Sequence, residues 1–201
     1  MEKRLLSEGF QNIMGLDEVG RGCLAGPVVA AGVILDPDHF VPDIADSKKM
    51  RADDREAIAG QIRNHAKCWT VAWCDNTAID AINILQASLK AMTRCVAKAL
   101  PQPDFLLIDG NRGLDSLLIR SQTVVKGDDR SASIGAASIL AKVYRDNLMA
   151  DLHRKYPEFG WDKNVGYPTV RHYEALKRHG YTPLHRTTFR LRTDRIYRKE
   201  Q

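Results

Sequence analysis

Residues 12–27, NIMGLDEVGRGCLAGP, decide the fold of this chain. A short apolar run there ends in two adjacent carboxylates, and a glycine-rich turn with one arginine leads into a second apolar run over residues 28–35. The pattern predicts two strands paired as a hairpin, with negative charge where the first strand ends. Because glycine lacks a Cβ, the N–H groups of the turn can approach a ligand closely. Carboxylates beside such a turn favour a divalent cation together with a phosphate or hydroxyl group, although acid–glycine sequences also form ordinary turns.

The spacing of apolar residues predicts the other elements. Strands are expected at 68–74, 104–110 and 121–126, helices at 52–65, 131–156 and from Pro168 to Gly180, and a loop at 157–166. Another long helix should carry one buried stripe, made of Ile82, Leu85, Leu89, Met92 and Val96. The uninterrupted apolar run at 105–108 requires helices on both faces of its sheet. We therefore expect one α/β domain over residues 1–201, with a five-stranded core at about 1–160 and a basic helical extension at about 161–201.

Composition and charge narrow the class of protein. The chain of 201 residues is 44% hydrophobic and can bury a core, but no apolar run approaches the ~20 residues that span a bilayer, so no membrane partner is expected. The four cysteines form no Cys-x-x-Cys pair and no signal peptide is evident, which predicts a cytoplasmic location. From Arg171 onward, nine Lys and Arg residues stand against three Asp and Glu residues. This excess suits a polyanionic partner or a solvated surface.

Acidic residues follow three of the predicted strands: Asp17 with Glu18, Asp109, and Asp128. If the first and fourth strands are adjacent, these carboxylates meet at one edge of the sheet and repel one another unless cations hold them. All-oxygen sites select Mg²⁺ or Mn²⁺, and two such ions can clamp a phosphodiester. Neighbouring residues of a strand point to opposite faces, so Asp17 and Glu18 can share a site only if the strand twists or bulges between them.

Six segments together resemble bacterial ribonuclease HII, and they occur in the order of that family. They are GLDEVGRG at 15–22, DSKK at 46–49, LIDG at 107–110, VKGD at 125–128, AASILAKV at 136–143 with Arg145-Asp146, and GYPT at 166–169. The resemblance implies a ribonuclease H-like fold with a mixed sheet and cleavage of the RNA strand of RNA/DNA hybrids. It also implies incision 5′ of single ribonucleotides embedded in duplex DNA, with 3′-hydroxyl and 5′-phosphate products. We expect the protein to act as a monomer.

The resemblance also assigns roles to single residues. Asp17, Glu18, Asp109 and Asp128 would be the catalytic metal-binding carboxylates. The turn Gly20-Arg21-Gly22 would contact the 2′-hydroxyl and phosphate at the RNA-to-DNA junction, and Tyr167 would pack against the deoxyribose after it, consistent with the role of the 2′-hydroxyl in distinguishing RNA from DNA. Candidates for phosphate contacts are Lys48, Lys49, Lys142 and Arg145.

Several positions depart from the family or have a purely structural interpretation. Cys23 stands where the family often has proline, and Val165 where lysine is common, so one phosphate contact could be missing. The pair His185-Arg186 also occurs in the family, where it would be structural or contact the backbone. Tyr167 could instead be a packing residue.

Some of the acidic, basic and histidine side chains also fit roles in folding alone. Asp128 could be a helix N-cap near Ser131, with Asp129 as the ligand in its place. Lys48 and Lys49 could simply begin a solvated helix. His172 and His179 lie seven apart, but no acid or cysteine completes a zinc set, so both are expected at the surface.

Three further activities fit parts of the pattern. A ribonuclease H of the other type would ignore one embedded ribonucleotide, and a related DNA nuclease or integrase would cut all-DNA duplex. A silent nucleic-acid-binding module would show no metal-dependent turnover, which the presence of all four acids argues against.

Overall fold

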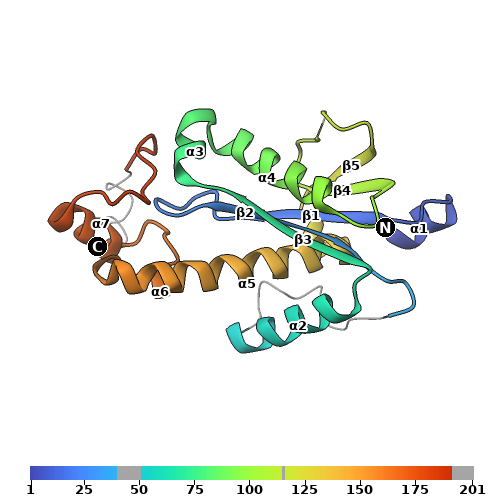
Figure 1. Cartoon of the computed structure of the whole chain (residues 1–201), viewed down its shortest axis with the longest axis horizontal. Coiled ribbons are helices and arrows are strands. Elements are labelled where there is room, and N and C mark those ends of the chain that lie inside the picture. The colour runs from blue at the N-terminus through green and yellow to red at the C-terminus, as the bar shows by residue number, and fades with distance from the viewer. Residues whose placement is uncertain (40–50, 115, 192–201) are drawn as a thin grey trace.

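A mixed five-stranded sheet with helices on both faces forms the centre of the molecule (Figure 1). The computed structural model describes residues 1–39, 51–114 and 116–191. The strands are β1 (Ile13–Val19), β2 (Val28–Ile34), β3 (Cys68–Cys74), β4 (Phe105–Asp109) and β5 (Arg120–Val124). Their order is β3-β2-β1-β4-β5, with antiparallel pairing from β1 to β3 and parallel pairing from β1 through β4 to β5. The expected hairpin and the adjacency of the first and fourth strands are confirmed.

Helices and single turns follow the strands. They are α1 (Glu2–Ser7), α2 (Ala52–His65), α3 (Asn76–Ile82), α4 (Ile84–Lys98), η2 (Gly127–Asp129), α5 (Ala132–Lys155), η3 (Pro157–Phe159), α6 (Trp161–Asn164) and α7 (Val170–His179). The predicted helix at 52–65 is confirmed, and the helix expected from 131 runs within the predicted limits. Two helices replace the single one expected around residue 82, because Asn83 adopts a positive φ of 66° and caps α4 by accepting from Gln86 N–H.

The two faces of the sheet pack against different helices. Met14 and Leu16 of β1 point into the core under α4, whereas the intervening Gly15 faces α5. A Cβ at Gly15 would lie 2.2 Å from the backbone carbon of Ser133, so a glycine is required for α5 to approach β1 this closely. This approach brings the middle of α5 to the strand ends that carry the acids.

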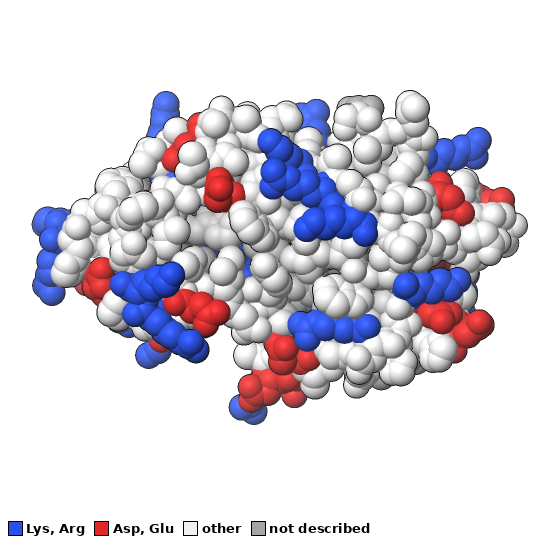
Figure 2. Space-filling model, viewed as in Figure 1, with Lys and Arg blue, Asp and Glu red and all other residues white. Residues whose placement is uncertain are grey.

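Strand β3 is an edge strand, and basic residues of α4 cover part of its free side. Arg94 donates to the Trp73 carbonyl at 2.6 Å, and Lys98 donates to the Val71 carbonyl at 3.3 Å. On the face of the molecule that Figure 2 shows, lysine and arginine side chains gather near the place where α4 lies in Figure 1. Because an exposed strand edge invites pairing with another chain, these contacts protect β3 from such association.

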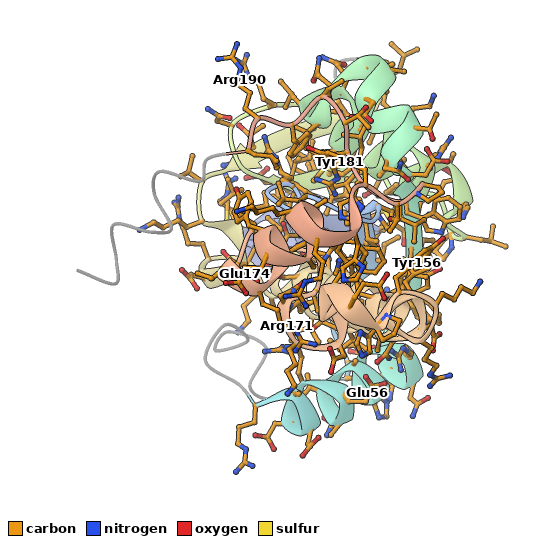
Figure 3. The ribbon with its side chains drawn as sticks, turned by 90° about the vertical axis from the view of Figure 1, so that its left-hand side faces the viewer. Glu56, Tyr156, Arg171, Glu174, Tyr181 and Arg190 are labelled. Carbon is orange, nitrogen blue, oxygen red and sulfur yellow. The ribbon has the colours of Figure 1, made fainter. Side chains whose placement is uncertain are left out.

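The C-terminal helices pack on the end of α5 and on the turn after β1. Figure 3 looks onto this end, with Arg171 and Glu174 on α7. The shared cluster consists of Leu24, Ala25, Met149, Phe159, Trp161, Tyr173, Ala175 and Leu176. The boundary at about residue 160 between a core and an extension stays a prediction, but the cluster joins both sides of it.

Three details of the C-terminal region differ from expectation. Residues 157–166, predicted as a loop, contain η3 and α6, because Phe159 and Trp161 are buried against α7 and need ordered backbone around them. Pro168 lies just before the helix, and Thr169 caps α7 by accepting from His172 N–H at 3.3 Å. The stripe expected to be fully buried is only half-buried at Ile82, Leu85 and Leu89, since these residues lie near openings to solvent.

Candidate active site

A polar cavity of about 390 Å³ opens where β1 and β4 end. Its lining includes all four predicted carboxylates, together with side chains from α2, α5 and the segment before α7. The lining residues are Asp17, Glu18, Val19, Arg55, Asp109, Asp128, Ser138, Ile139, Lys142 and Tyr167. Residues more than 100 positions apart in sequence therefore share one site.

Asp17 and Asp109 are neighbours across the parallel ladder of β1 and β4. Leu16 pairs with Ile108, so the following residue of each strand carries its carboxylate to the same end of the sheet. The Asp109 carboxylate accepts a hydrogen bond of 2.7 Å from Gly127 N–H, which fixes it to η2. This arrangement accounts for the negative charge at the floor of the cavity.

Asp128 and Asp129 occupy different environments although they are adjacent. Asp128 is 6% exposed and lines the cavity, whereas Asp129 faces solvent. The N-cap of α5 is Ser131, whose hydroxyl accepts from Ile134 N–H at 3.2 Å. The geometry therefore favours Asp128 over Asp129 as the fourth acid and gives no capping role to either.

Asp17 and Glu18 reach the site from opposite faces of β1. Asp17 lies on the α5 side, where the Ser138 hydroxyl hydrogen-bonds to it. Glu18 also lines a second cavity of about 170 Å³ beside Leu85 and Met92 of α4. Both acids nevertheless line the same cavity at the end of β1, and the strand pairs with β2 without a bulge.

Burial and mutual repulsion make this group of acids unfavourable without a counter-charge. Burial raises the pKa of Asp17 well above its usual value, and the charges of Glu18 and Asp109 raise it further. Burial also raises the pKa of Glu18, although the Arg21 guanidinium at 2.9 Å opposes this effect. A bound cation would relieve this repulsion.

The donor set fits a hard divalent cation. Every candidate ligand is a carboxylate oxygen, the class that Mg²⁺ and Mn²⁺ prefer. Within residues 1–39, 51–114 and 116–191, no three His, Cys, Asp or Glu side chains already stand close enough to hold a metal ion. Coordination by Asp17, Glu18, Asp109 and Asp128 would therefore require their side chains to move closer together.

The glycine turn after β1 is held from behind by two buried arginines. Arg186, 1% exposed, donates to the carbonyls of Gly20, Arg21 and Gly26 at 2.7–3.1 Å. A Cβ at Gly20, which has a φ of +91°, would lie 2.2 Å from the Arg145 Nε. The turn therefore owes its shape to side chains from α5 and the C-terminal segment, and the structural role expected for Arg186 is confirmed.

Arg145 is a correction to the predicted phosphate contacts. Its side chain is 0% exposed and donates to the carbonyls of Ala25, Pro27 and Val165 at 2.7–3.2 Å. A guanidinium with all three nitrogens bound inside the protein cannot reach a substrate phosphate. Sequence could not reveal this, because the acceptors lie in two distant loops.

His172 is a second correction, since it is 0% exposed although a surface position was expected. Its Nδ1 lies 3.0 Å from the Tyr167 carbonyl and its Nε2 lies 3.1 Å from the Nε2 of His185. His179 is exposed, as predicted. His172 therefore supports the backbone of the residue that faces the cavity.

Known proteins share this architecture and sequence. The family model described as ribonuclease HII matches residues 14–192. A ribonuclease HII of Salinibacter ruber is 50% identical over 196 residues, covering 96% of this chain and 98% of that protein. The chain belongs to the ribonuclease HII family.

Solved structures agree with this assignment. The ribonuclease HII of Archaeoglobus fulgidus, solved in complex with PCNA, superposes with a TM-score of 0.79 at 26% identity, covering 91% of this chain and 97% of that one. A Bst ribonuclease HIII solved in complex with Mn²⁺ has a TM-score of 0.67 at 22% identity, covering 89% and 67%, and shares the fold. As a ribonuclease HII, the chain is a divalent-metal-dependent endoribonuclease that acts on RNA/DNA hybrids, and the predicted ribonuclease H-like fold is confirmed.

The remaining predicted substrate-binding residues differ in their surroundings. Tyr167 is 38% exposed at the cavity wall. Lys142 lines the same cavity and pairs with Asp146 at 2.7 Å. Lys48 and Lys49 lie outside the described residues, so their roles stay predictions.

Two cavity residues of this ribonuclease HII were not predicted as functional. Ser138 stands one turn before Lys142 on α5, and their i, i+4 spacing could have indicated a shared face. Arg55 of α2 also lines the cavity, but nothing in its local sequence distinguishes it from a solvated helix residue.

In the described part of the chain, no helix is long and apolar enough to cross a bilayer.

Proposed function

We propose that this ribonuclease HII incises duplex DNA on the 5′ side of a single embedded ribonucleotide, as well as cutting RNA/DNA hybrids. The observation that carries the proposal is the meeting of four carboxylates in one cavity beside the turn at 20–22. The acids would provide a site for hydrolysis, and the glycine turn beside them would provide backbone donors for a sugar hydroxyl. The proposal extends to action as a monomer in the cytoplasm, which the four free, buried thiols suit.

The carboxylates of Asp17, Glu18, Asp109 and Asp128 would hold two ions, either Mg²⁺ or Mn²⁺. When bound, such ions supply an activated water and stabilise the leaving 3′-oxygen, which yields 3′-hydroxyl and 5′-phosphate ends. The carboxylates would fix the positions of the ions, and through them the position of the scissile phosphate, at the end of β1 and β4. Asp109 is held for this task by Gly127 N–H, and Asp17 by the Ser138 hydroxyl.

Recognition would involve the two sides of the cavity. The backbone of Gly20, Arg21 and Gly22 would contact the 2′-hydroxyl and the adjacent phosphate. The exposed ring of Tyr167 would pack against the following deoxyribose, where an additional hydroxyl would not fit. Lys142, Lys48 and Lys49 would contact backbone phosphates.

The test compares three substrates of identical sequence: an RNA/DNA hybrid, a DNA duplex with one ribonucleotide, and an all-DNA duplex. We expect incision of the first two, in the presence of Mg²⁺ or Mn²⁺ and not with a chelator, with the cut mapped to the 5′ side of the ribonucleotide. Cleavage of the hybrid alone would indicate the specificity of the other type of ribonuclease H. Cleavage of all-DNA duplex would contradict the proposed recognition of the hydroxyl.

A further inference from the structure

Arg186 fixes the direction of two consecutive peptide groups in the turn. Its Nη2 donates to the Gly20 carbonyl at 2.7 Å and its Nη1 donates to the Arg21 carbonyl at 2.9 Å. The remaining bonds of the guanidinium go to the Gly26 carbonyl, at 2.9 and 3.1 Å. Both carbonyls of the turn therefore point toward the protein interior.

Because the peptide bond is planar, the directions of these two carbonyls also fix the directions of the N–H groups that follow them. In a trans peptide the C=O and the following N–H point in opposite directions. Since the carbonyls of Gly20 and Arg21 face Arg186, the N–H groups of Arg21 and Gly22 face away from it. Neither amide has an acceptor in the part of the chain that the structure describes. These two donors are therefore available to a ligand.

The open side of the turn lies next to the cavity. A Cβ built at Gly22 would have a single neighbour within 4 Å, the Cε1 of Tyr167 at 3.7 Å, and Tyr167 lines the cavity with the acids. Gly22 thus faces open space, whereas Gly20 is packed against Arg145. Two successive amides that face outward form a concave donor site for an oxygen atom, as in the nests that bind anions.

We propose that Arg186 is a positioning residue for ribonucleotide recognition, because it holds the amides of Arg21 and Gly22 toward a sugar hydroxyl or phosphate oxygen of the substrate. The inference rests on the proposed recognition of the ribonucleotide by this turn. A buried guanidinium also places a positive charge behind the two donors, which strengthens their attraction for an electron-rich oxygen. Arg186 itself does not touch the substrate.

The experiment compares the affinities of the protein for two duplexes and does not measure the rate of incision. Affinities for a DNA duplex with one ribonucleotide and for the matched all-DNA duplex are determined by fluorescence anisotropy in chelator, so that no turnover occurs. Arg186→Lys keeps the charge but cannot hold both carbonyls. We expect the ratio of the two affinities to fall about fivefold, the effect of one hydrogen bond, with little change for all-DNA duplex.

Thr70→Val is the control, since Thr70 is also buried and donates to a backbone carbonyl, that of Cys95 at 3.1 Å, but lies on β3 and contributes nothing to the turn. It should lower the melting temperature and preserve the ratio. If both variants change the ratio equally, or if Arg186→Lys weakens binding to both duplexes in parallel, Arg186 has only a structural role and the proposal is wrong. A wild-type ratio of one would overturn it as well.

A second variant serves if Arg186→Lys does not fold. Asp80 accepts four hydrogen bonds from Thr187 and Thr188, which anchors the segment that carries Arg186. Asp80→Ala keeps Arg186 itself but releases the segment that carries it, so that the guanidinium holds the two carbonyls less firmly, and we expect about a twofold loss of the ratio. An unchanged ratio in this folded variant would then refute the proposal. Incision by the wild-type protein decides the proposed function separately.

Discussion

Asp17 and Asp109 lie side by side at the end of the parallel ladder of β1 and β4, each one residue beyond the paired Leu16 and Ile108. The pairing places two carboxylates on neighbouring strands, which lie about 4.8 Å apart in a sheet. Burial keeps water from separating their charges, so the negative charge of Asp109 contributes to the raised pKa of Asp17. Repulsion between these buried carboxylates therefore lowers the stability of the metal-free fold. The predictions about the acids rest on this repulsion.

Replacement of either acid should separate activity from stability. Asp17→Asn and Asp109→Asn each remove a proposed metal ligand, and since loss of outer-shell partners alone costs about 10–100-fold, cleavage should fall by more than about a hundredfold. The metal-free melting temperature should stay equal or rise, because one repelling charge is gone. Hybrid cleavage assays and thermal melts in chelator measure both. A variant with full activity would exclude its residue from the site.

Metal binding should depend on pH through Asp17. A folded-state pKa above the unfolded value of 3.8 means that this group stabilises the fold fully below pH 3.8 and loses that contribution as the pH rises through the raised pKa. Since the ion requires the carboxylate, the gain in melting temperature on addition of Mg²⁺ should increase over the same window. The Asp17→Asn variant should show a weaker pH dependence, with the raised pKa of Glu18 accounting for what remains. A gain that does not change with pH in the wild type would contradict the assignment.

Loss of the Tyr167 ring should affect the junction more than general binding. We expect Tyr167→Ala to lower incision at a single ribonucleotide by about tenfold, the effect of one stacking contact, with a smaller effect on the affinity for plain duplex. Tyr167→Phe keeps the ring and is the control, which should retain most of the incision. Equal losses of incision and of duplex affinity in Tyr167→Ala would indicate a packing role.

The buried pair His172 and His185 should make the protein sensitive to acid. A carbonyl only accepts, so His172 Nδ1 donates to Tyr167 and its Nε2 accepts from His185 and from Trp161 Nε1, at 3.1 and 3.3 Å. His185 Nδ1 accepts from Thr182 N–H at 2.9 Å. Both rings are neutral in this arrangement, because every nitrogen that accepts would lose its partner on protonation.

The direction of the pH effect follows from the pKa values of the pair. Burial lowers the pKa of His185 from 6.5 to about 4, and burial also lowers that of His172. The contribution of these residues to stability is complete above pH 6.5 and is lost as the pH falls toward 4, by about 1–3 kcal/mol. Urea unfolding at pH values from 7 to 4 tests this, because it measures the slope of the free energy of unfolding against pH. The control is His179→Gln, at an exposed position, which should leave this slope unchanged. His185→Gln should flatten the slope, and an unaltered slope would contradict the neutral pair.

The glycines of the turn should differ in their tolerance of a methyl group. Gly20→Ala places a Cβ 2.2 Å from the Arg145 Nε at a φ of +91°, so the free energy of unfolding should fall by about 1–3 kcal/mol. Gly22→Ala meets only the Tyr167 ring at 3.7 Å and should change it by less than about 0.5 kcal/mol. Chemical denaturation of the two variants makes the comparison. Equal destabilisation would mean that Arg145 does not pack behind Gly20.

Much of the fold was predictable from local patterns. Short apolar runs that end in acids located β1, β4 and the carboxylates Asp17, Glu18 and Asp109, because a strand that ends in charge must end at the edge of the core. The break at Asn83 was not predictable, since the apolar spacing continues through it and only a positive φ interrupts the helix. The left-handed conformation of Lys126 was not predictable either. This residue precedes η2, in which Asp128 is buried and Asp129 is exposed.

The sequence by itself determined the order of the five strands along the chain and which acids could form the site, since hydrophobic period and strand ends are local properties. Only the tertiary structure decided that Arg145, His172 and Arg186 are buried. A polar side chain can leave water only where acceptors or donors replace its hydration, and here loops distant in sequence supply them. Their partners depend on how the whole chain packs, which no local pattern records.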